Sequence, residues 1–90
     1  MPQAIVDPEE LRRFAASLKK FSGEARDRMI ALNGHFQELG KSWRDQENRK
    51  FAEEFERHLR ALAHFVEVTD EYVPFLLRKA EMVEQYLQQR

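Results

Sequence analysis

Apolar residues recur every seven positions along most of the chain, a pattern typical of helices that bury one face. In the first half of the chain, the central row consists of Leu11, Leu18, Ala25, Leu32 and Leu39. A second row, on one side of it, holds Phe14 and Phe21. A third row, on the other side, holds Ala15, Met29, Phe36 and Trp43. This stripe is wider than the seam of a strict coiled coil. It predicts a core-facing helix over about residues 8–40.

The two ends of this first helix carry signals of their own. Asp7 can cap the helix, Pro8 fits the first helical position, and Glu9 suits the positive end of the helix dipole. Gly40 is the predicted stop, because glycine readily takes the left-handed conformation in which many helices end.

The second half of the chain carries three parallel rows of apolar residues. They are Ala52, Leu59, Val66, Val73, Ala80 and Leu87; then Phe55, Leu62, Thr69, Leu76 and Val83; and finally Phe51, Phe65, Tyr72 and Tyr86. These rows predict a second helix over about residues 45–88, with Ser42 or Asp45 as its cap. Pro74 removes a backbone donor, so we expect a kink there or a restart capped by Thr69 or Asp70.

A short joint, residues 40–45, separates the two predicted helices, and short joints make neighbouring helices antiparallel. The predicted fold is therefore all-α, an antiparallel two-helix hairpin in a single domain. One hairpin buries one seam, so the additional apolar rows predict association into a four-helix-bundle dimer. The candidates for the dimer interface are Met29, Phe36, Trp43, Phe51, Phe55, Phe65, Tyr72 and Tyr86.

Composition narrows the possible functions. Lys and Arg total 15 and Asp and Glu total 16, which argues against a nucleic-acid binder. The basic residues around the joint alternate with acidic ones and predict a mixed-charge surface, with RNA binding by a hairpin dimer as the alternative. No apolar run has the length of a signal peptide or of a membrane span, so we expect synthesis in the cytoplasm and no membrane insertion.

Candidate chemistry is sparse. The chain has no cysteine, which excludes disulfides and thiolate chemistry. His35, His58 and His64 lack the helical spacing of a two-histidine zinc site, and His58 is predicted to be a half-buried interface residue. Glu67 is followed at the third position by Asp70, so the Glu-x-x-His spacing of di-metal bundles is absent there. We predict no catalytic residues, no metal, no cofactor and no enzyme activity.

The joint carries the only tryptophan, in the stretch GKSWRDQENRKFAEEF at residues 40–55. A chain of this length, with two long helices and a tryptophan between them, resembles the WXG proteins, small helical-hairpin substrates of type VII secretion systems. The family motif is Trp-x-Gly at the turn, followed by a large apolar residue. Here Trp43 is followed eight positions later by Phe51 and then by Phe55.

Two features depart from the family pattern. Asp45 holds the position of the motif glycine, and aspartate caps a helix start at least as well. The family's tail signal, a tyrosine followed four residues later by an acid, is missing, since Leu76 follows Tyr72 and Arg90 follows Tyr86. The resemblance implies a non-enzymatic substrate or adaptor that pairs with a second copy or a related chain. A secretion ATPase or a toxin would be a further partner, and export would need no cleavable signal.

Two alternatives remain open at the level of sequence. Trp43 can be a lid that closes the end of a helical bundle, with or without a role in secretion. The whole chain can be a cytoplasmic hairpin that serves as an interaction module or scaffold and is never exported.

Overall fold

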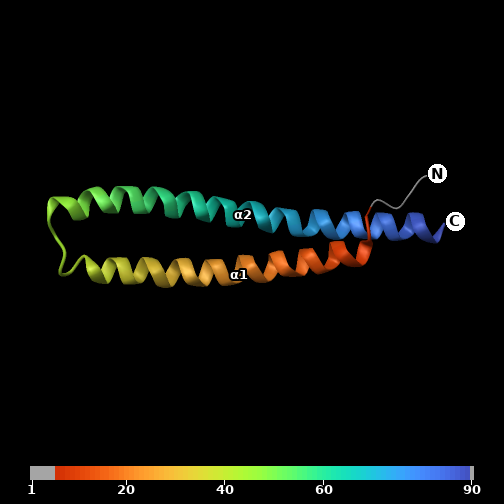
Figure 1. Cartoon of the computed structure of the whole chain (residues 1–90), viewed down its shortest axis with the longest axis horizontal. Helices are drawn as coiled ribbons and strands as arrows, with labels where there is room; N and C mark the ends of the chain where they lie inside the picture. Colours follow the sequence, from red (N-terminus) through yellow and green to blue (C-terminus); the bar gives the residue numbers. More distant parts are fainter. Residues whose placement is uncertain (1–5, 90) are drawn as a thin grey trace.

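The computed structural model describes residues 6–89, and these form two long helices. Helix α1 (Pro8–Leu39) and helix α2 (Gln46–Gln88) run antiparallel and are connected by a short joint, so that the start of α1 and the end of α2 lie at the same end of the molecule (Figure 1). The hairpin measures 68 × 20 × 14 Å. No strand occurs in this part of the chain, and the predicted all-α hairpin is confirmed.

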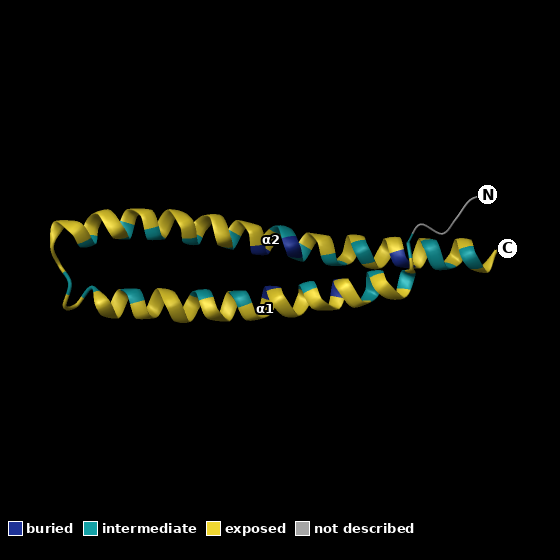
Figure 2. Ribbon diagram, viewed as in Figure 1, coloured by how far each residue is buried: buried dark blue, intermediate teal, exposed yellow. Residues whose placement is uncertain are grey.

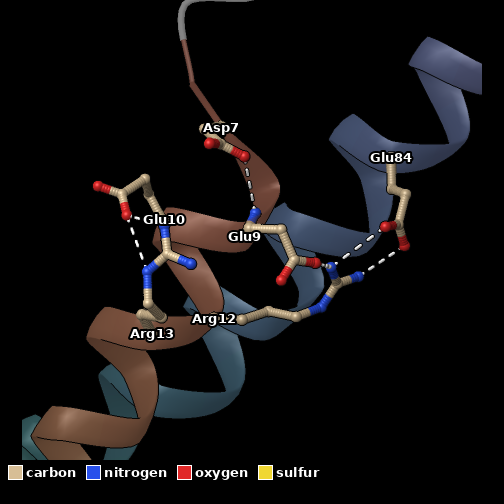
Figure 3. A network of polar contacts seen from close by, with 6 residues as sticks. All are labelled: Asp7, Glu9, Glu10, Arg12, Arg13 and Glu84. Atoms are coloured by element: carbon tan, nitrogen blue, oxygen red, sulfur yellow. Dashed lines mark hydrogen bonds and ion pairs between the residues drawn. The ribbon is translucent and has the colours of Figure 1, made fainter.

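Helix α1 begins as its sequence predicts. Asp7 has an extended backbone, and its side chain accepts a hydrogen bond of 2.9 Å from the amide of Glu9 (Figure 3). Pro8 occupies the first helical position, where its missing amide hydrogen leaves no bond unmade. Glu9 and Glu10 lie in the first turn, beside the positive end of the helix dipole.

The prediction that Gly40 ends α1 in a left-handed conformation is wrong. Its φ and ψ are −63° and −16°, which is right-handed helical geometry. The exposed carbonyls are satisfied by other donors: the Lys41 amide bonds to Glu38 at 3.1 Å, and the Trp43 amide bonds to Leu39 at 2.9 Å. The chain therefore leaves the helix through tightened turns and needs no residue with positive φ.

Helix α2 begins at a cap and then runs without interruption. The carboxylate of Asp45 accepts a hydrogen bond of 3.0 Å from the amide of Asn48, so Asp45 and not Ser42 is the cap. The predicted restart near Pro74 is wrong, because the helix continues through it to Gln88. Thr69 instead donates to the carbonyl of Val66 within the helix, at 2.7 Å.

The seam between the helices holds a very small core. Five of the described residues are buried: Ala15, Ser22, Val66, Thr69 and Ala80 (Figure 2). They lie in the middle of the hairpin and toward its open end, where small side chains let the helices approach closely. Toward the joint the seam is filled by half-buried aromatic rings, and the two ribbons lie further apart (Figure 1).

Polar contacts cross the seam at two levels. Near the open end, the guanidinium of Arg12 donates to both carboxylate oxygens of Glu84, at 2.6 and 3.2 Å, and also to Glu9 (Figure 3). In the middle, the buried hydroxyl of Ser22 donates to Asp70 at 2.5 Å, and Arg26 pairs with the same carboxylate. These contacts join residues that are far apart in the sequence and so fix how the two helices align.

We expect the hairpin to lose stability in acid through these contacts. Hydrogen bonds from Arg26 and Ser22 lower the pKa of Asp70, and the bond from Arg12 lowers the pKa of Glu84. A carboxylate whose folded pKa is depressed stabilises the fold above its unfolded pKa and loses that contribution as the pH falls through the folded value. The melting temperature should therefore decrease once the pH drops below about 4. In the Asp70→Asn and Glu84→Gln variants the melting temperature should depend less on pH than in the parent chain. A decrease in acid as large as that of the parent chain would contradict this.

Replacement of Pro74 by alanine should stabilise the hairpin. Proline lacks the amide hydrogen that would bond to the carbonyl of Asp70, and it is about 3 kcal/mol less favourable than alanine inside a helix. Urea denaturation should show an increase in the free energy of unfolding that approaches this value. Glu81→Ala, an exposed change one row step further along α2, is the control and should stay within about 0.5 kcal/mol of the parent chain.

Candidate functional site

The two long sides of the hairpin differ in chemistry. On one side the rings of Phe21 and Phe65 meet edge to face, with centroids 6.3 Å apart. On the other side the helices are joined by the ion pairs Arg12–Glu84 and Arg26–Asp70. The aromatic face, as we call the first side, consists of the outward rows Phe14, Phe21, Arg28 and His35 of α1 and Phe51, His58, Phe65, Tyr72, Lys79 and Tyr86 of α2.

The aromatic face is largely open to solvent. Its six phenylalanine and tyrosine side chains each expose between 45% and 57% of their surface. A shallow groove lies on it, lined by residues that include Phe21, Glu24, Arg28, Leu32 and Leu62. Large contiguous apolar patches on soluble proteins mark sites of interaction with other molecules. The aromatic face is therefore the candidate functional site.

A cluster of four aromatic rings closes the seam at the joint. The ring of Phe36 lies 4.8 Å from that of Phe55 and 5.7 Å from that of Phe51, measured between centroids. Phe51 and Phe55 stack at 5.6 Å with an interplanar angle of 14°, and Trp43 lies 5.9 Å from Phe51. Offset and edge-to-face rings at such distances attract each other beyond the burial of their area. The cluster holds the end of α1 against the start of α2.

The joint positions Trp43 through backbone and side-chain contacts. The guanidinium of Arg44 donates twice to the carbonyl of Lys41, at 2.8 and 3.0 Å, and thereby fixes the turn before the tryptophan. Trp43 is half-buried, as expected of a lid that a single hairpin covers only in part. Asp45 stands at the position of the motif glycine and acts as the cap of α2.

The predicted interface residues fall into two groups. Four of them are half-buried along the hairpin's own seam: Met29, Phe36, Trp43 and Phe55. The other four lie exposed on the aromatic face: Phe51, Phe65, Tyr72 and Tyr86. The prediction that they contact a second chain stays a prediction, and it now rests mainly on the exposed four.

Sequence reasoning left residues out of the candidate site. Phe14 and Phe21 belong to the aromatic face, and their spacing of seven residues was the available signal. Phe75 and Met82 are also exposed on α2, at 56% and 63%, and lie seven residues apart. His58, which the sequence placed at an interface, is exposed in the single chain.

Other kinds of site find little support in residues 6–89. His35, His58 and His64 are all exposed, and no group of three histidine or carboxylate side chains in this range is placed to hold a metal ion. Neither of the two described helices combines the length and the apolarity needed to cross a membrane. A second groove, on the side of the ion pairs, is lined by residues that include Ile30, Asn33 and Leu59.

Comparison with known proteins points to one family. The family model "WXG100: Proteins of 100 residues with WXG" matches residues 3–86 of the chain. Among solved structures, wild-type EsxB, a secreted protein from Bacillus anthracis str. Sterne, is 28% identical with a TM-score of 0.76, and the match covers 92% of this chain and 89% of that one. A proline-to-alanine mutant of EsxB is 27% identical with a TM-score of 0.79, over 94% and 96% of the two chains. No curated protein sequence matches the chain.

Replacement of Trp43 by alanine should destabilise the single hairpin by about 2 kcal/mol, roughly half the loss for a fully buried aromatic ring. The reason is its half-burial against Phe51. Denaturation should be measured at low protein concentration, so that folding and association are separated. Asp45→Gly, which keeps a residue accepted at caps, is the control and should cost only a few tenths of a kcal/mol. If Trp43→Ala leaves the denaturation midpoint unchanged, the ring does not hold the joint closed. The tryptophan would then serve as an exposed contact for another protein.

Proposed function

Because the chain belongs to the WXG100 family, we propose that it is a substrate or adaptor of type VII secretion that works by pairing with a second helical hairpin. The chain is a small helical hairpin and not an enzyme. In this proposal its working surface is the aromatic face, which packs against the partner to form a four-helix bundle. The paired hairpins are then presented to the secretion machinery as one unit.

The observation that carries the pairing is the imbalance between the core and the exposed apolar surface. The largest fully buried side chain is that of Val66, whereas all six rings of the aromatic face stand about half exposed. The chain exposes 7492 Å². A compact protein of this mass exposes about 5,500 Å². Small domains without disulfides or metals commonly gain stability by associating, and a second hairpin supplies the missing apolar contact.

The energetic gain from such pairing is substantial. Full burial of a large apolar side chain contributes about 1.5 to 3 kcal/mol, so covering the exposed half of one ring contributes roughly 1 kcal/mol. The six rings of each chain lie along most of the length of the hairpin, so the gain accumulates over many contacts. Since small domains are stabilised by only about 5 kcal/mol or somewhat more, pairing and folding are coupled in this proposal.

Export is the second part of the proposal. The similar EsxB structures are those of a secreted protein, and the resemblance to the WXG family implies export without a cleavable signal. Neither Tyr72 nor Tyr86 fits the tail pattern, because Leu76 and Arg90 stand at the fourth position after them. We therefore propose that the paired chain supplies the tail signal read by the secretion ATPase. A toxin is the other candidate for the partner that supplies this signal.

The missing tail pattern also favours a second candidate function. In that alternative the chain uses the same aromatic face within the cytoplasm, as an interaction module or scaffold that is never exported. The two functions use the same pairing surface and differ only in whether the pair is exported or stays in the cytoplasm. Genes for an FtsK-like ATPase or a large toxin beside this gene would favour secretion.

Secretion is tested by mass spectrometry of culture filtrate from the native host under secreting conditions. We expect the protein in the filtrate of the parent strain and its loss when the secretion ATPase gene is deleted. A cytoplasmic protein measured in the same filtrates controls for lysis. Absence from the parent filtrate, or presence at equal levels in both filtrates, would refute the proposal of export and leave the cytoplasmic alternative.

Pairing is tested with serine substitutions on the aromatic face. The double variant Phe21→Ser with Phe65→Ser removes the edge-to-face pair on this face, and it should weaken association at least tenfold in sedimentation experiments. Ile30→Ser is the matched control, because Ile30 is 72% exposed and lines the groove on the opposite side. Equal association of both variants and the parent chain would show that the aromatic face is not the pairing surface.

A further inference from the structure

We propose that Arg44 is the residue that positions Trp43, so that the middle position of the Trp-Arg-Asp sequence is not freely exchangeable in this chain. Its guanidinium holds the segment that leads from the tryptophan into α2. Because Arg44 lies in the joint, this role does not depend on which face of the hairpin pairs. Only the recognition of the joint by another protein rests on the proposed function.

The joint turns the chain without any residue in the left-handed conformation. Gly40 has right-handed helical geometry, and Asp45, at the position of the motif glycine, is extended with φ of −88° and ψ of −175°. No residue in the described range 6–89 other than glycine has a positive φ, and no glycine there has one either. The freedom that glycine gives to a backbone is therefore not used here. The shape of the joint has to come from contacts between its residues.

Backbone hydrogen bonds tie the joint to α1 only as far as Trp43. The amides of Ser42 and Trp43 both donate to the carbonyl of Leu39, at 3.1 and 2.9 Å. Within residues 6–89, the amides of the next two residues make no backbone hydrogen bond. The side chain of Arg44 joins this segment back to the turn, because its Nε and Nη2 donate to the carbonyl of Lys41 at 3.0 and 2.8 Å.

The packing of Trp43 is light in comparison with that of the other rings at the joint. Phe36, Phe51 and Phe55 all contact one another, with centroids between 4.8 and 5.7 Å apart. Among the rings of the described chain, Trp43 meets Phe51 alone, at 5.9 Å, and it stays half-buried. Ring packing thus does little to hold the indole, and the backbone that carries it largely decides where it lies.

The chemistry of arginine suits this task. The planar guanidinium presents its N–H donors in a rigid fork, so two bonds to one carbonyl fix the direction of the side chain. Hydrogen bonds from a charged donor are also stronger than those between neutral groups. Arg44 makes no ion pair with a carboxylate in residues 6–89, although Asp45 and Glu47 are close in the sequence. Lysine, with a single nitrogen, cannot form the same fork.

A fixed indole matters for recognition of the joint. The half of Trp43 that Phe51 leaves uncovered is available for contact, and tryptophan is enriched among the residues that dominate binding energy. In the proposed function the secretion machinery contacts this uncovered side. Because Arg44 holds the ring in one orientation beforehand, binding does not have to order it.

Tryptophan fluorescence tests the positioning directly, because Trp43 is the only tryptophan in the chain. We would measure the emission maximum and the quenching by acrylamide in Arg44→Ala and in the parent chain, at protein concentrations where the hairpin is not associated. Arg49→Ala is the matched control, because it removes an exposed positive charge at the start of α2. Circular dichroism checks that each variant keeps its helical content.

In Arg44→Ala the emission should move to longer wavelength. The quenching constant should rise roughly twofold, because the joint opens locally and the half-covered ring becomes fully accessible. Arg49→Ala should match the parent chain. Arg44→Lys, which keeps the charge and loses the fork, should lie between them, and it decides the question if Arg44→Ala does not fold. Parent-like fluorescence in the Arg44 variants, or an equal change in Arg49→Ala, would overturn the positioning role.

Export distinguishes this role from the proposed function. In the native host, the amount of Arg44→Ala in the culture filtrate should fall severalfold below that of Arg49→Ala at equal cellular levels. Equal amounts of the two variants in the filtrate would show that the secretion machinery does not read the orientation of the ring. Absence of the parent chain from the filtrate would refute export, and the fluorescence result alone would then decide whether Arg44 positions Trp43.

Discussion

Two antiparallel helices enclose a single line of contact, and this constraint governs the rest of the structure. A side chain on the seam meets one neighbouring helix, and no third element covers it from behind. Full burial is therefore reached only where the side chains are small and the helices approach closely, at Ala15, Ser22, Val66, Thr69 and Ala80. Larger residues on the same stripe remain partly in water, which is why a chain so rich in phenylalanine has such a modest core.

The same constraint explains the polar contacts in the seam. An apolar stripe of uniform character would let the helices slide past each other by one turn at little cost. Ser22 and Asp70 meet in only one alignment, and a slip would leave the buried hydroxyl without its acceptor. Arg12 and Glu84 repeat the restriction near the open end. The polar pairs thus specify the alignment, and the apolar residues supply the contact area.

The sequence predicted those parts of the structure that follow from local periodicity. The row from Ala52 to Leu87 lies on the seam along its whole length, and the caps at Asp7 and Asp45 are present. Non-local partners could not be predicted in this way: Ser22 was passed over because its acceptor lies 48 residues away. Gly40 ends α1 as predicted, but its predicted left-handed conformation was wrong, since backbone amides and the Arg44 guanidinium occupy carbonyls around the turn.

The candidate site was predictable in outline and not in detail. The sequence has more rows of aromatic residues than one helix–helix seam can bury, and this excess predicted an interaction surface. The tryptophan indicated where the joint lies. Which rings turn inward depends on how far each helix rotates about its own axis when the two pack together. Phe36 and Phe55 face the seam while Phe65 faces solvent, although all three belong to apolar rows in the sequence.

That the start of α1 and the end of α2 lie at the same end of the molecule has a mechanical consequence (Figure 1). A pull that separates the start of α1 from the end of α2 loads the contacts around the Arg12–Glu84 pair first and then opens the seam turn by turn, so the force is never spread over the whole interface. A hairpin of this kind resists heat through the sum of its contacts, yet it yields to a directed pull through one contact at a time.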